Sequence, residues 1–580
     1  MNKWLINNRG KNFSEVSTKY NIHPLIAKIL LNREIKNFET FLNPSAENSY
    51  HDPFLMKDMD KAVDIVIDAI ENNKNIRIVG DYDQDGNSST MTLLDGLGYF
   101  TDKLSYDIPN RMTDGYGISY NIIDKCIEDN IDLIITCDNG ISAIEQCDYA
   151  KANGIRIIVT DHHQTIKKDD LEIIPNADAV VNPQQQSCEY PFKSLCGAGV
   201  AYKLIQAINI KKGYGMLECE NLLQYVAMGT VCDIVDLKDE NRYFVTKGLE
   251  EINNTDNYGL KCLIDMTGIK NAVNVYSLGF IIGPCINAAG RLDTAKLGVE
   301  LFRDENMNNV ETYAKILVEL NEKRKKLTEE GFNKAVELVE NTELKNDDIL
   351  ICNIDGIHES VCGIIAGRIK EKYHKPTLIL TKSENQNILK GSGRSIPEYD
   401  IFNEFDVFRE FFISFGGHPM ACGLSIDEAK LDEFRIKVNE NSKLTQEDFV
   451  NKIIIDSSFY VDKIDFDLIE KIDSLRPFGK DNPRPILGDK DIEIIFAKMI
   501  GKNNNVLKLK LLKNNKTIDA IMFSEAIEKY NYLLEKFGEN TLNQLENSIS
   551  CNANIDILYY PEINDFNNVK NIQLNLIDLR

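Results

Sequence analysis

Short apolar stretches and amphipathic segments alternate along the first half of the chain. Residues 76–79, 131–136 and 155–160 are three such stretches, each rich in isoleucine, valine or threonine. The segments between them have the apolar spacing of helices. Because strands that alternate with helices are typical of a parallel α/β sheet, we predict such a sheet here.

The pattern changes after residue 300. Residues 308–340 have helical spacing without a glycine until Gly331, which predicts one long helix. A second alternation of strands and helices begins at residue 348. Residues 453–580 contain about five strand-like runs, and in one of them, 506–511, apolar and polar residues alternate. These strands fit a small barrel of the OB type, although a generic β domain fits the same pattern.

These changes of pattern set the predicted domains. Apolar repeats at residues 22–31 and 62–70 predict helices, which we assign to the core of the first α/β domain. The fold class is α/β, in which a helix connects two α/β domains and a β-barrel follows. The parts are an N-terminal helical segment (1–70), a parallel-sheet domain (71–305), a connecting helix (306–345), a second α/β domain (346–445) and the barrel (450–580).

Acidic residues and histidines follow the predicted strands. They are Asp81, Asp83 and Asp85 after the first strand, Asp138 after the second, Asp161, His162 and His163 after the third, and Asp233 after a later apolar segment. The carboxyl ends of parallel strands meet at one edge of a sheet, so we expect these side chains to converge. Two unit charges about 4 Å apart repel by roughly 4 kcal/mol at an effective dielectric near 20, so the cluster needs cations.

The ligand types favour Mn²⁺ or Mg²⁺. Carboxylates and imidazoles occur without an organised group of thiolates, which argues against structural zinc. With Asp138 as a bridge, the set could hold two cations that clamp both oxygens of a phosphoryl displacement. The acidic run also fits a calcium loop of the EF-hand type, but that loop needs a carboxylate at Thr92 and a preceding helix. Taken alone, the Asp161 motif could be a surface turn, and Asp138 could cap a helix.

Two glycine-rich segments in the second α/β domain are candidate phosphate sites. They contain Ser392 and Arg394 in residues 391–395, and His418 in residues 415–418. Glycine lets backbone N–H groups approach a phosphate closely, although glycine segments are also simple turns. The basic run at 323–326 is interpreted as a solvated face of the long helix, with a face that flanks nucleic acid as the alternative.

Net charge and cysteine content bear on nucleic-acid binding and on the cellular compartment. The 66 basic and 90 acidic residues give a net charge of 66 − 90 = −24, which is unusual for a protein that binds phosphates. Part of the negative charge belongs to the acidic cluster, where bound cations would reverse its sign. If the protein binds nucleic acid, we therefore expect the binding to depend on metal and to be confined to a channel. The 13 cysteines are scattered without a Cys-x-x-Cys pair, as in reduced cytosolic proteins. We find no signal peptide or membrane span and predict a cytoplasmic protein.

The chain resembles a known family in several of these motifs. The Asp161-His162-His163 run is similar to the name-giving motif of the DHH phosphoesterases, and residues 80–86 look like the first motif of the RecJ family within it. Further resemblances over about 500 residues lie at 108–117, 195–201, 229–233, 287–291, 391–395, 415–418 and 477–483. The chain departs from the family pattern at several positions, among them Cys285, where an arginine is common, and Asp481, where a glycine is usual.

The resemblance implies roles for individual residues. The metal ligands would be Asp83, Asp85, Asp138, His162 and Asp233, with Asp81 and Asp161 as further ligands or as residues that orient them. His163 would contact the scissile phosphate. Phosphate and substrate contacts would come from Arg111, Asn287, Arg291, Ser392, Arg394 and His418, and a 5′-terminal phosphate would be bound by Arg111, Ser392 and Arg394.

The resemblance also implies an activity. It is 5′→3′ hydrolysis of single-stranded DNA to 5′-mononucleotides, in DNA repair and recombination, by a monomer that a helicase or single-strand-binding protein could assist. Three alternatives stay open. They are a DHH phosphodiesterase of short oligonucleotides or cyclic dinucleotides, a DNA-binding scaffold without activity, and a manganese-dependent pyrophosphatase. Length and the predicted barrel argue against the first and third, and the complete ligand set argues against the second.

Overall fold

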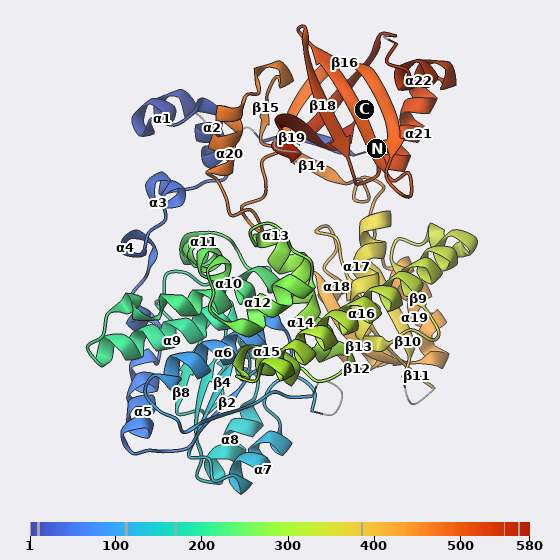
Figure 1. Cartoon of the computed structure of the whole chain (residues 1–580). Coiled ribbons are helices and arrows are strands. Elements are labelled where there is room, and N and C mark those ends of the chain that lie inside the picture. The colour runs from blue at the N-terminus through green and yellow to red at the C-terminus, as the bar shows by residue number, and fades with distance from the viewer. Residues whose placement is uncertain are drawn as a thin grey trace. The chain divides into compact units, whose positions relative to one another are not determined.

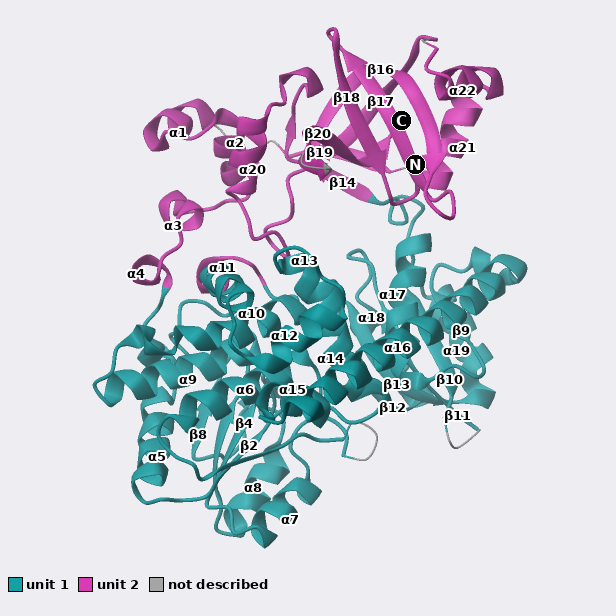
Figure 2. Cartoon of the chain, in the orientation of Figure 1, with its two compact units in different colours: residues 1, 50–235, 243–451 teal, residues 2–49, 236–242, 452–580 magenta. Residues whose placement is uncertain are grey.

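The computed structural model describes residues 2–7, 12–110, 114–168, 171–383, 387–549, 551–566 and 569–580. The chain forms two compact units (Figure 2). Unit 1 contains residues 50–235 and 243–451, and unit 2 contains residues 2–49, 236–242 and 452–580. Among the described residues, every helix is too short or too polar to cross a membrane.

The first sheet of unit 1 is entirely parallel, as predicted. Its strand order is β3-β2-β4-β5-β8. The strands are β2 (Ile76–Val79), β3 (Leu104–Asp107), β4 (Leu133–Cys137), β5 (Arg156–Thr160) and β8 (Ala179–Val181). The β2 and β4 strands are buried throughout, because helices cover both faces of such a sheet.

Helices cover the two faces of this sheet (Figure 1). On one face, α7 (Tyr120–Glu128) and α8 (Ile144–Ala152) share a core with the strands. On the other, α6 (Gln84–Gly98) and α9 (Gly197–Lys211) contact the sheet, and α10 (Leu223–Cys232) packs on both of them. Unit 1 also contains α5 (Met59–Glu71), α12 (Tyr258–Met266), α13 (Val275–Ser277), the π-helix η3 (Leu278–Ile282), α14 (Gly283–Leu292) and α15 (Lys296–Arg303).

The long helix predicted after residue 306 is α16 (Met307–Asn341). It packs on α12, α14 and α15, and also on α17 (Cys362–Tyr373) of the second α/β domain. Three residues of its basic run are exposed, whereas Arg324 is half-buried and donates to Asn321 Oδ1. The Asn321 amide in turn lies 3.3 Å from the Sγ of Cys285 on α14. The small thiol at position 285 is therefore covered by α16.

The second α/β domain has a mixed sheet, β12-β13-β11-β10-β9. Only β9 and β10 pair in parallel, and the other pairs are antiparallel. The strands are β9 (Leu350–Asn353), β10 (Thr377–Lys382), β11 (Ile388–Arg394), β12 (Phe412–His418) and β13 (Ala421–Asp427), and the helices are α17 (Cys362–Tyr373), α18 (Ile401–Asp406) and α19 (Leu431–Glu440).

The β-barrel predicted at the end of the chain is present in unit 2. Its strands follow the order β15-β16-β17-β18-β20-β19, and β16 also pairs with β19, which closes the sheet. Leu507, Leu509 and Leu511 point into the core, as the alternation predicts. The strands are β15 (Ser457–Ser458), β16 (Leu487–Ile500), β17 (Val506–Lys513), β18 (Lys516–Met522), β19 (Ala553–Phe566) and β20 (Val569–Leu579). Helices α20 (Phe466–Asp473), α21 (Ala526–Phe537) and α22 (Glu539–Glu546) accompany them.

Residues 2–7 and 12–49 belong to the same unit as this barrel, which differs from their expected place in the core of the parallel-sheet domain. Strand β1 (Lys3–Ile6) pairs in parallel with β14 (Lys452–Ile455). Ile26, Ile29 and Leu30 of α2 (Pro24–Asn32) join the same apolar core as the barrel strands. The helical repeat at residues 22–31 reports a buried face, but it contains no information about the partner that covers that face.

Candidate metal centre

The acidic motifs converge at the carboxyl edge of the parallel sheet, as expected. Strands β2, β4 and β5 are neighbours, so the residues that follow them lie side by side. Three overlapping groups have ligand atoms within 4.8 Å of one another: Asp138, Asp161, His162 and His163; Asp85, His162 and Asp233; and Asp81, Asp83 and Asp138. A strand precedes Asp81, which excludes the EF-hand alternative.

Asp85 is held by a helix that begins more than 100 residues later. The backbone N–H groups of Gly197 and Ala198, at the start of α9, donate to its carboxylate at 2.6 and 3.0 Å. The positive end of a helix dipole favours an anion at this place. Burial nevertheless raises the pKa of Asp85 above its usual value. A side chain at position 229 would crowd this carboxylate, because a Cβ on Gly229 would lie 2.4 Å from Oδ1.

Asp138 has the most demanding position in the cluster. Its φ of 61° lies in the left-handed region, which costs energy for most residues with a side chain. Its Oδ1 is 3.0 Å from His162 Nε2. Both atoms are buried, and neither makes a well-aligned hydrogen bond within the described part of the chain. Burial and the neighbouring carboxylates raise the pKa of Asp138 well above its usual value.

His162 is poised as a neutral ligand. Its Nε2 also lies 3.8 Å from Asp85 Oδ2 and 3.7 Å from Asp233 Oδ2. Burial and the adjacent His163 lower the pKa of His162, and neutral imidazole is the form that coordinates a metal. Asp233 follows the last residue of α10, and Asp83 caps the start of α6 by accepting from Gly86 N–H at 3.1 Å.

The carboxylate of Asp161 is engaged by the protein itself. It accepts from the backbone N–H of Ile141 at 2.9 Å and of His162 at 2.7 Å. His163 Nδ1 lies 2.8 Å from its Oδ1. Burial alone would raise the pKa of Asp161, but these hydrogen bonds and the charge on His163 lower it. Burial opposes protonation of His163, but its hydrogen bond with Asp161 outweighs burial and raises its pKa to about 9.

Two residues at this edge were missed as site residues by the sequence interpretation. The Tyr116 hydroxyl donates to the backbone oxygen of Asp138 at 3.0 Å and lies 3.1 Å from His163 Nδ1. The Asn139 amide donates to Val79 O and Cys137 O, which ties together the ends of two strands. Tyr116 stands between two glycines with positive φ, Gly115 and Gly117, and this tight turn is the signal that could have found it.

The predicted residues on α14 lie beside the metal loop and the second domain. The side-chain oxygen Oδ1 of Asn287 accepts a hydrogen bond from the backbone N–H of Gln84, at the start of α6, at 2.7 Å. Arg291 donates from Nη1 to Ser360 O at 2.9 Å. The α14 helix thereby connects the acidic edge to the second α/β domain.

The two glycine segments form strands, which corrects the expectation of loops. Ser392 and Arg394 lie on β11, and His418 lies on β12. The glycines permit close packing inside the sheet, because a Cβ on Gly391 would lie 2.1 Å from the backbone oxygen of Ile379.

Arg394 and His418 come to the same end of the second sheet. Both are aligned with Ala421 of β13, on its two sides. Burial and the charge of Arg394 lower the pKa of His418. Ser392 lines a small cavity of about 190 Å³ together with Ser360, Ser414 and Ser425. Arg111 lies outside the described residues.

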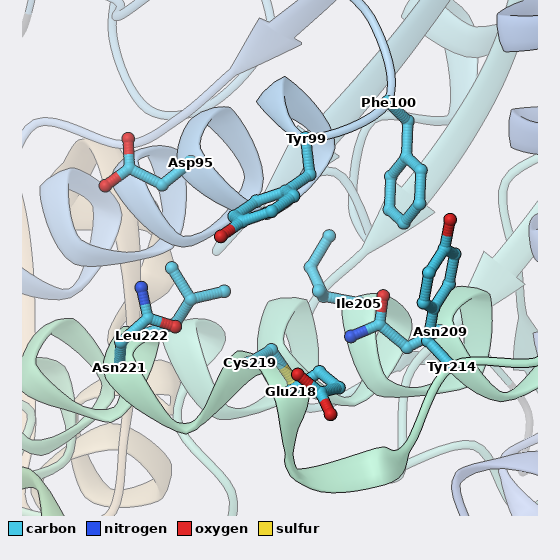
Figure 3. A pocket seen from close by; sticks show the side chains of 11 residues that line it. Asp95, Tyr99, Phe100, Ile205, Asn209, Tyr214, Glu218, Cys219, Asn221 and Leu222 are labelled. Carbon is cyan, nitrogen blue, oxygen red and sulfur yellow. The ribbon is translucent and has the colours of Figure 1, made fainter.

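A larger cavity, of about 290 Å³, lies at the other end of α6 from the acidic residues (Figure 3). The rings of Tyr99, Phe100 and Tyr214 surround it, and Ile205 of α9 forms part of its wall. Asp95, at its edge, accepts from the Tyr225 hydroxyl at 2.9 Å. Among the predicted site residues that the structure describes, none lines this cavity.

Three family models match the chain in order. They are the N-terminal domain of the DHH family at residues 75–230, the DHHA1 domain at 346–443 and the RecJ OB domain at 455–578. The matches correspond to the parallel-sheet domain, the second α/β domain and the barrel.

Similar proteins match over nearly the whole chain. The single-stranded-DNA-specific exonuclease RecJ of Bacillus subtilis is 32% identical over 97% of this chain and 69% of that protein. The protein of the same name from Haemophilus influenzae is 32% identical over 96% of both chains. Crystal structures of Thermus thermophilus RecJ with Mn²⁺ and with Mg²⁺ have the same fold, with TM-scores of 0.80 and 0.76 at 22% and 21% identity; each match covers 100% of this chain, and 79% and 78% of the respective RecJ chain. The chain belongs to the RecJ family.

Proposed function

We propose that this protein is a metal-dependent exonuclease that degrades single-stranded DNA in the 5′→3′ direction and releases 5′-mononucleotides. The observation that carries the proposal is the pair of buried atoms Asp138 Oδ1 and His162 Nε2, which lie 3.0 Å apart without a well-aligned hydrogen bond. A bound cation would give both atoms the electrostatic partner that they lack. The relatives named as single-stranded-DNA-specific exonucleases support the substrate.

The residues of the cluster fit Mn²⁺ or Mg²⁺. Four carboxylates and one neutral imidazole provide the hard oxygen and nitrogen ligands that these ions take. The proposed ligands are Asp83, Asp85, Asp138, His162 and Asp233, with Asp81 beside them. When bound, two such ions lower the pKa of an attacking water and neutralise the charge that develops on the phosphoryl oxygens.

Other residues hold the ligands and the substrate in place. The N–H groups at the start of α9 fix the carboxylate of Asp85. Asp161 is engaged by the protein, so its proposed role is to orient His163, whose ring would donate to an oxygen of the scissile phosphate. The Tyr116 hydroxyl holds the backbone of Asp138. These contacts keep the reacting groups aligned before the substrate arrives.

The second α/β domain would recognise the end of the strand. We assign the 5′-phosphate to Ser392, Arg394 and Arg111, with His418 beside them, because guanidinium groups bind phosphate in a bidentate manner. Arg394 and His418 lie at the same end of the sheet, on the two strands that flank β13, which supports a shared ligand. Asn287 and Arg291 would contact the next part of the substrate from α14.

The remaining parts of the proposal concern the role of the barrel, the cellular compartment and the oligomeric state. The barrel would guide single strands through stacking and backbone contacts, as OB folds do. All 13 cysteines are free thiols, which supports a reducing compartment such as the cytoplasm. We infer a monomer that acts in DNA repair and recombination and works with a helicase or a single-strand-binding protein.

Product analysis tests the proposal. Single-stranded DNA labelled at the 5′ or the 3′ end would be incubated with Mn²⁺, Mg²⁺ or EDTA, beside a matching duplex. The expected result is immediate mononucleotide release from the 5′ label, a shrinking ladder from the 3′ label, and no reaction in EDTA. Cleavage confined to short oligonucleotides would favour the small-substrate phosphodiesterase. DNA binding without cleavage in either metal would favour the scaffold.

A further inference from the structure

Two aromatic side chains of unit 1 stack on each other in solvent. The rings of Tyr276 and Phe280 have centroids 4.9 Å apart and planes 23° apart. Their exposed fractions are 64% and 68%. Neighbouring residues Leu278 and Ile282 are fully buried, so the helix is anchored by those residues and the two rings are not needed for its packing.

The two rings stand on the helix that also carries two proposed substrate contacts. The segments α13, η3 and α14 follow one another without a break from Val275 to Leu292. Residues three and four apart are neighbours on a helix surface, so one row passes through the two rings and continues towards the acidic edge. Its members are Tyr276, Phe280, Pro284, Asn287 and Arg291. The rise of a helix separates Phe280 from Asn287 by about 10 Å.

This helix is fixed to the element that carries a candidate metal ligand. The Sγ of Cys232, the residue before Asp233, donates to Leu278 O at 3.6 Å. A Cβ on Gly283 would lie 2.3 Å from the same sulfur, so the two helices are in close contact. The π-helical turn between Leu278 and Ile282 lies at this contact, and such turns are frequent at functional sites.

The occupant that fits this row is a single strand of nucleic acid. Every base has a π-face, and stacking on exposed aromatic rings is how proteins hold single strands without reading their sequence. A protein partner would also cover apolar rings, but the row continues directly into Asn287 and Arg291, which approach the metal loop and Ser360. Continuity with the proposed cleavage site therefore favours DNA.

We propose that Tyr276 and Phe280 form a platform on which bases of the substrate stack, several nucleotides away from the bond that is cleaved. The proposal rests on the proposed function and assigns a part of the path of the strand. It follows that the platform contributes to the affinity for long strands. A dinucleotide, held at the cleavage site, does not reach it.

The test compares long and short substrates. Replacing both rings, Tyr276→Ala with Phe280→Ala, is expected to raise KM for a long single strand by roughly 10-fold or more, since the bases then lose the rings on which they stack. The kcat/KM for a 5′-phosphorylated dinucleotide is expected to stay at the wild-type value. The conservative pair Tyr276→Phe with Phe280→Trp is expected to restore the affinity. Tyr99→Ala removes an even more exposed ring, beside the cavity at the far end of α6, and serves as the control.

Each outcome is informative. Unchanged KM for the long strand, or equal losses on both substrates, would overturn the platform. Binding is measured separately by fluorescence anisotropy of a labelled long strand with the rings replaced in an Asp138→Ala background, where cleavage is not required. If the wild-type protein cleaves nothing but the rings still contribute to this affinity, the proposed activity fails and the platform stands.

Discussion

The two ends of helix α6 differ in whether their buried polar groups have partners: one end carries the acidic cluster, and the other borders an empty cavity. At its N-terminal end, carboxylates and an imidazole crowd together, and buried atoms of Asp138 and His162 lack well-aligned hydrogen bonds. At its C-terminal end there is more space, but Asp95 has its hydrogen bond from Tyr225, and no side chain that lines the cavity has a buried polar atom without a partner among the described residues. At these two places the need for a ligand follows the crowded carboxylates and the unsatisfied atoms among them, and it does not follow the empty volume.

The largest expected effect comes from Asp138. Replacing it by asparagine should lower the rate of cleavage by roughly 10³-fold or more, because the metals are asked to supply several kcal/mol and each 1.4 kcal/mol is about tenfold. Product formation from end-labelled single-stranded DNA measures this loss. A wild-type rate would remove Asp138 from the metal site.

The same variant has an opposite effect on stability. The pKa of Asp138 is raised in the folded protein, so its ionised form at neutral pH costs free energy of folding when no metal is bound. Asp138→Asn should therefore raise the Tm in EDTA. Mn²⁺ should raise the Tm of the wild type, by linkage, and raise that of the variant much less. A lower Tm of the variant in EDTA would contradict the proposed repulsion between Asp138 and its neighbouring carboxylates.

Two glycines, one beside the acidic cluster and one at the C-terminal end of α6, give the next largest effect. A Cβ on Gly197 would lie 2.5 Å from the Cβ of Asp138, whereas nothing lies within 4 Å of a Cβ on Gly98, the last residue of α6. Gly197→Ala should reduce kcat by at least about 10-fold, since small displacements at a reacting centre are costly. Gly98→Ala should leave kcat unchanged and stabilise the fold by about 0.5–1 kcal/mol. Equal behaviour of the two variants would contradict the assigned geometry.

A smaller effect is expected from the Tyr116 hydroxyl. Tyr116→Phe removes the hydrogen bond to the backbone of Asp138, and one such bond contributes about 1 kcal/mol. The rate should fall about fivefold, while DNA affinity in a binding assay stays the same. Tyr120→Phe is the matched control, because its hydroxyl contacts the exposed Glu145 on α8.

The smallest effect is expected at the cavity. Tyr214→Ala removes part of its wall, and the rate of cleavage should stay within about twofold of the wild type, because exposed substitutions away from special features change stability by less than about 0.5 kcal/mol. A large loss of activity would show that the two ends of α6 are coupled.

The sequence predicts the sheet and the convergence at its edge because both follow from local patterns. Strands read from β-branched runs must end at one edge, and Asp81, Asp138 and Asp161 follow them directly. The partners of Asp85 could not be predicted in this way. Gly197 and Ala198 follow more than 100 residues later, and no local pattern encodes which helix start will face a given carboxylate.

The two glycine segments of the second α/β domain were wrongly interpreted from the sequence. In the segments at 391–395 and 415–418 glycine suggested phosphate loops, whereas the structure uses it for close contact between strands. Asp481 gives the reverse case. It replaces a glycine of the family pattern and keeps the backbone at a φ of 59°, which aspartate tolerates better than most residues.

The pairing of β1 with β14 has a consequence for the order of events during synthesis. The first strand of the chain finds its partner at residues 452–455, so it leaves the ribosome hundreds of residues before that partner exists. The parallel-sheet domain can complete its core in the meantime, since domains fold as units and the N-terminal ones first. Strand β1 must wait as an unpaired edge until residues 452–455 have been translated, and its docking then completes this two-stranded sheet of unit 2.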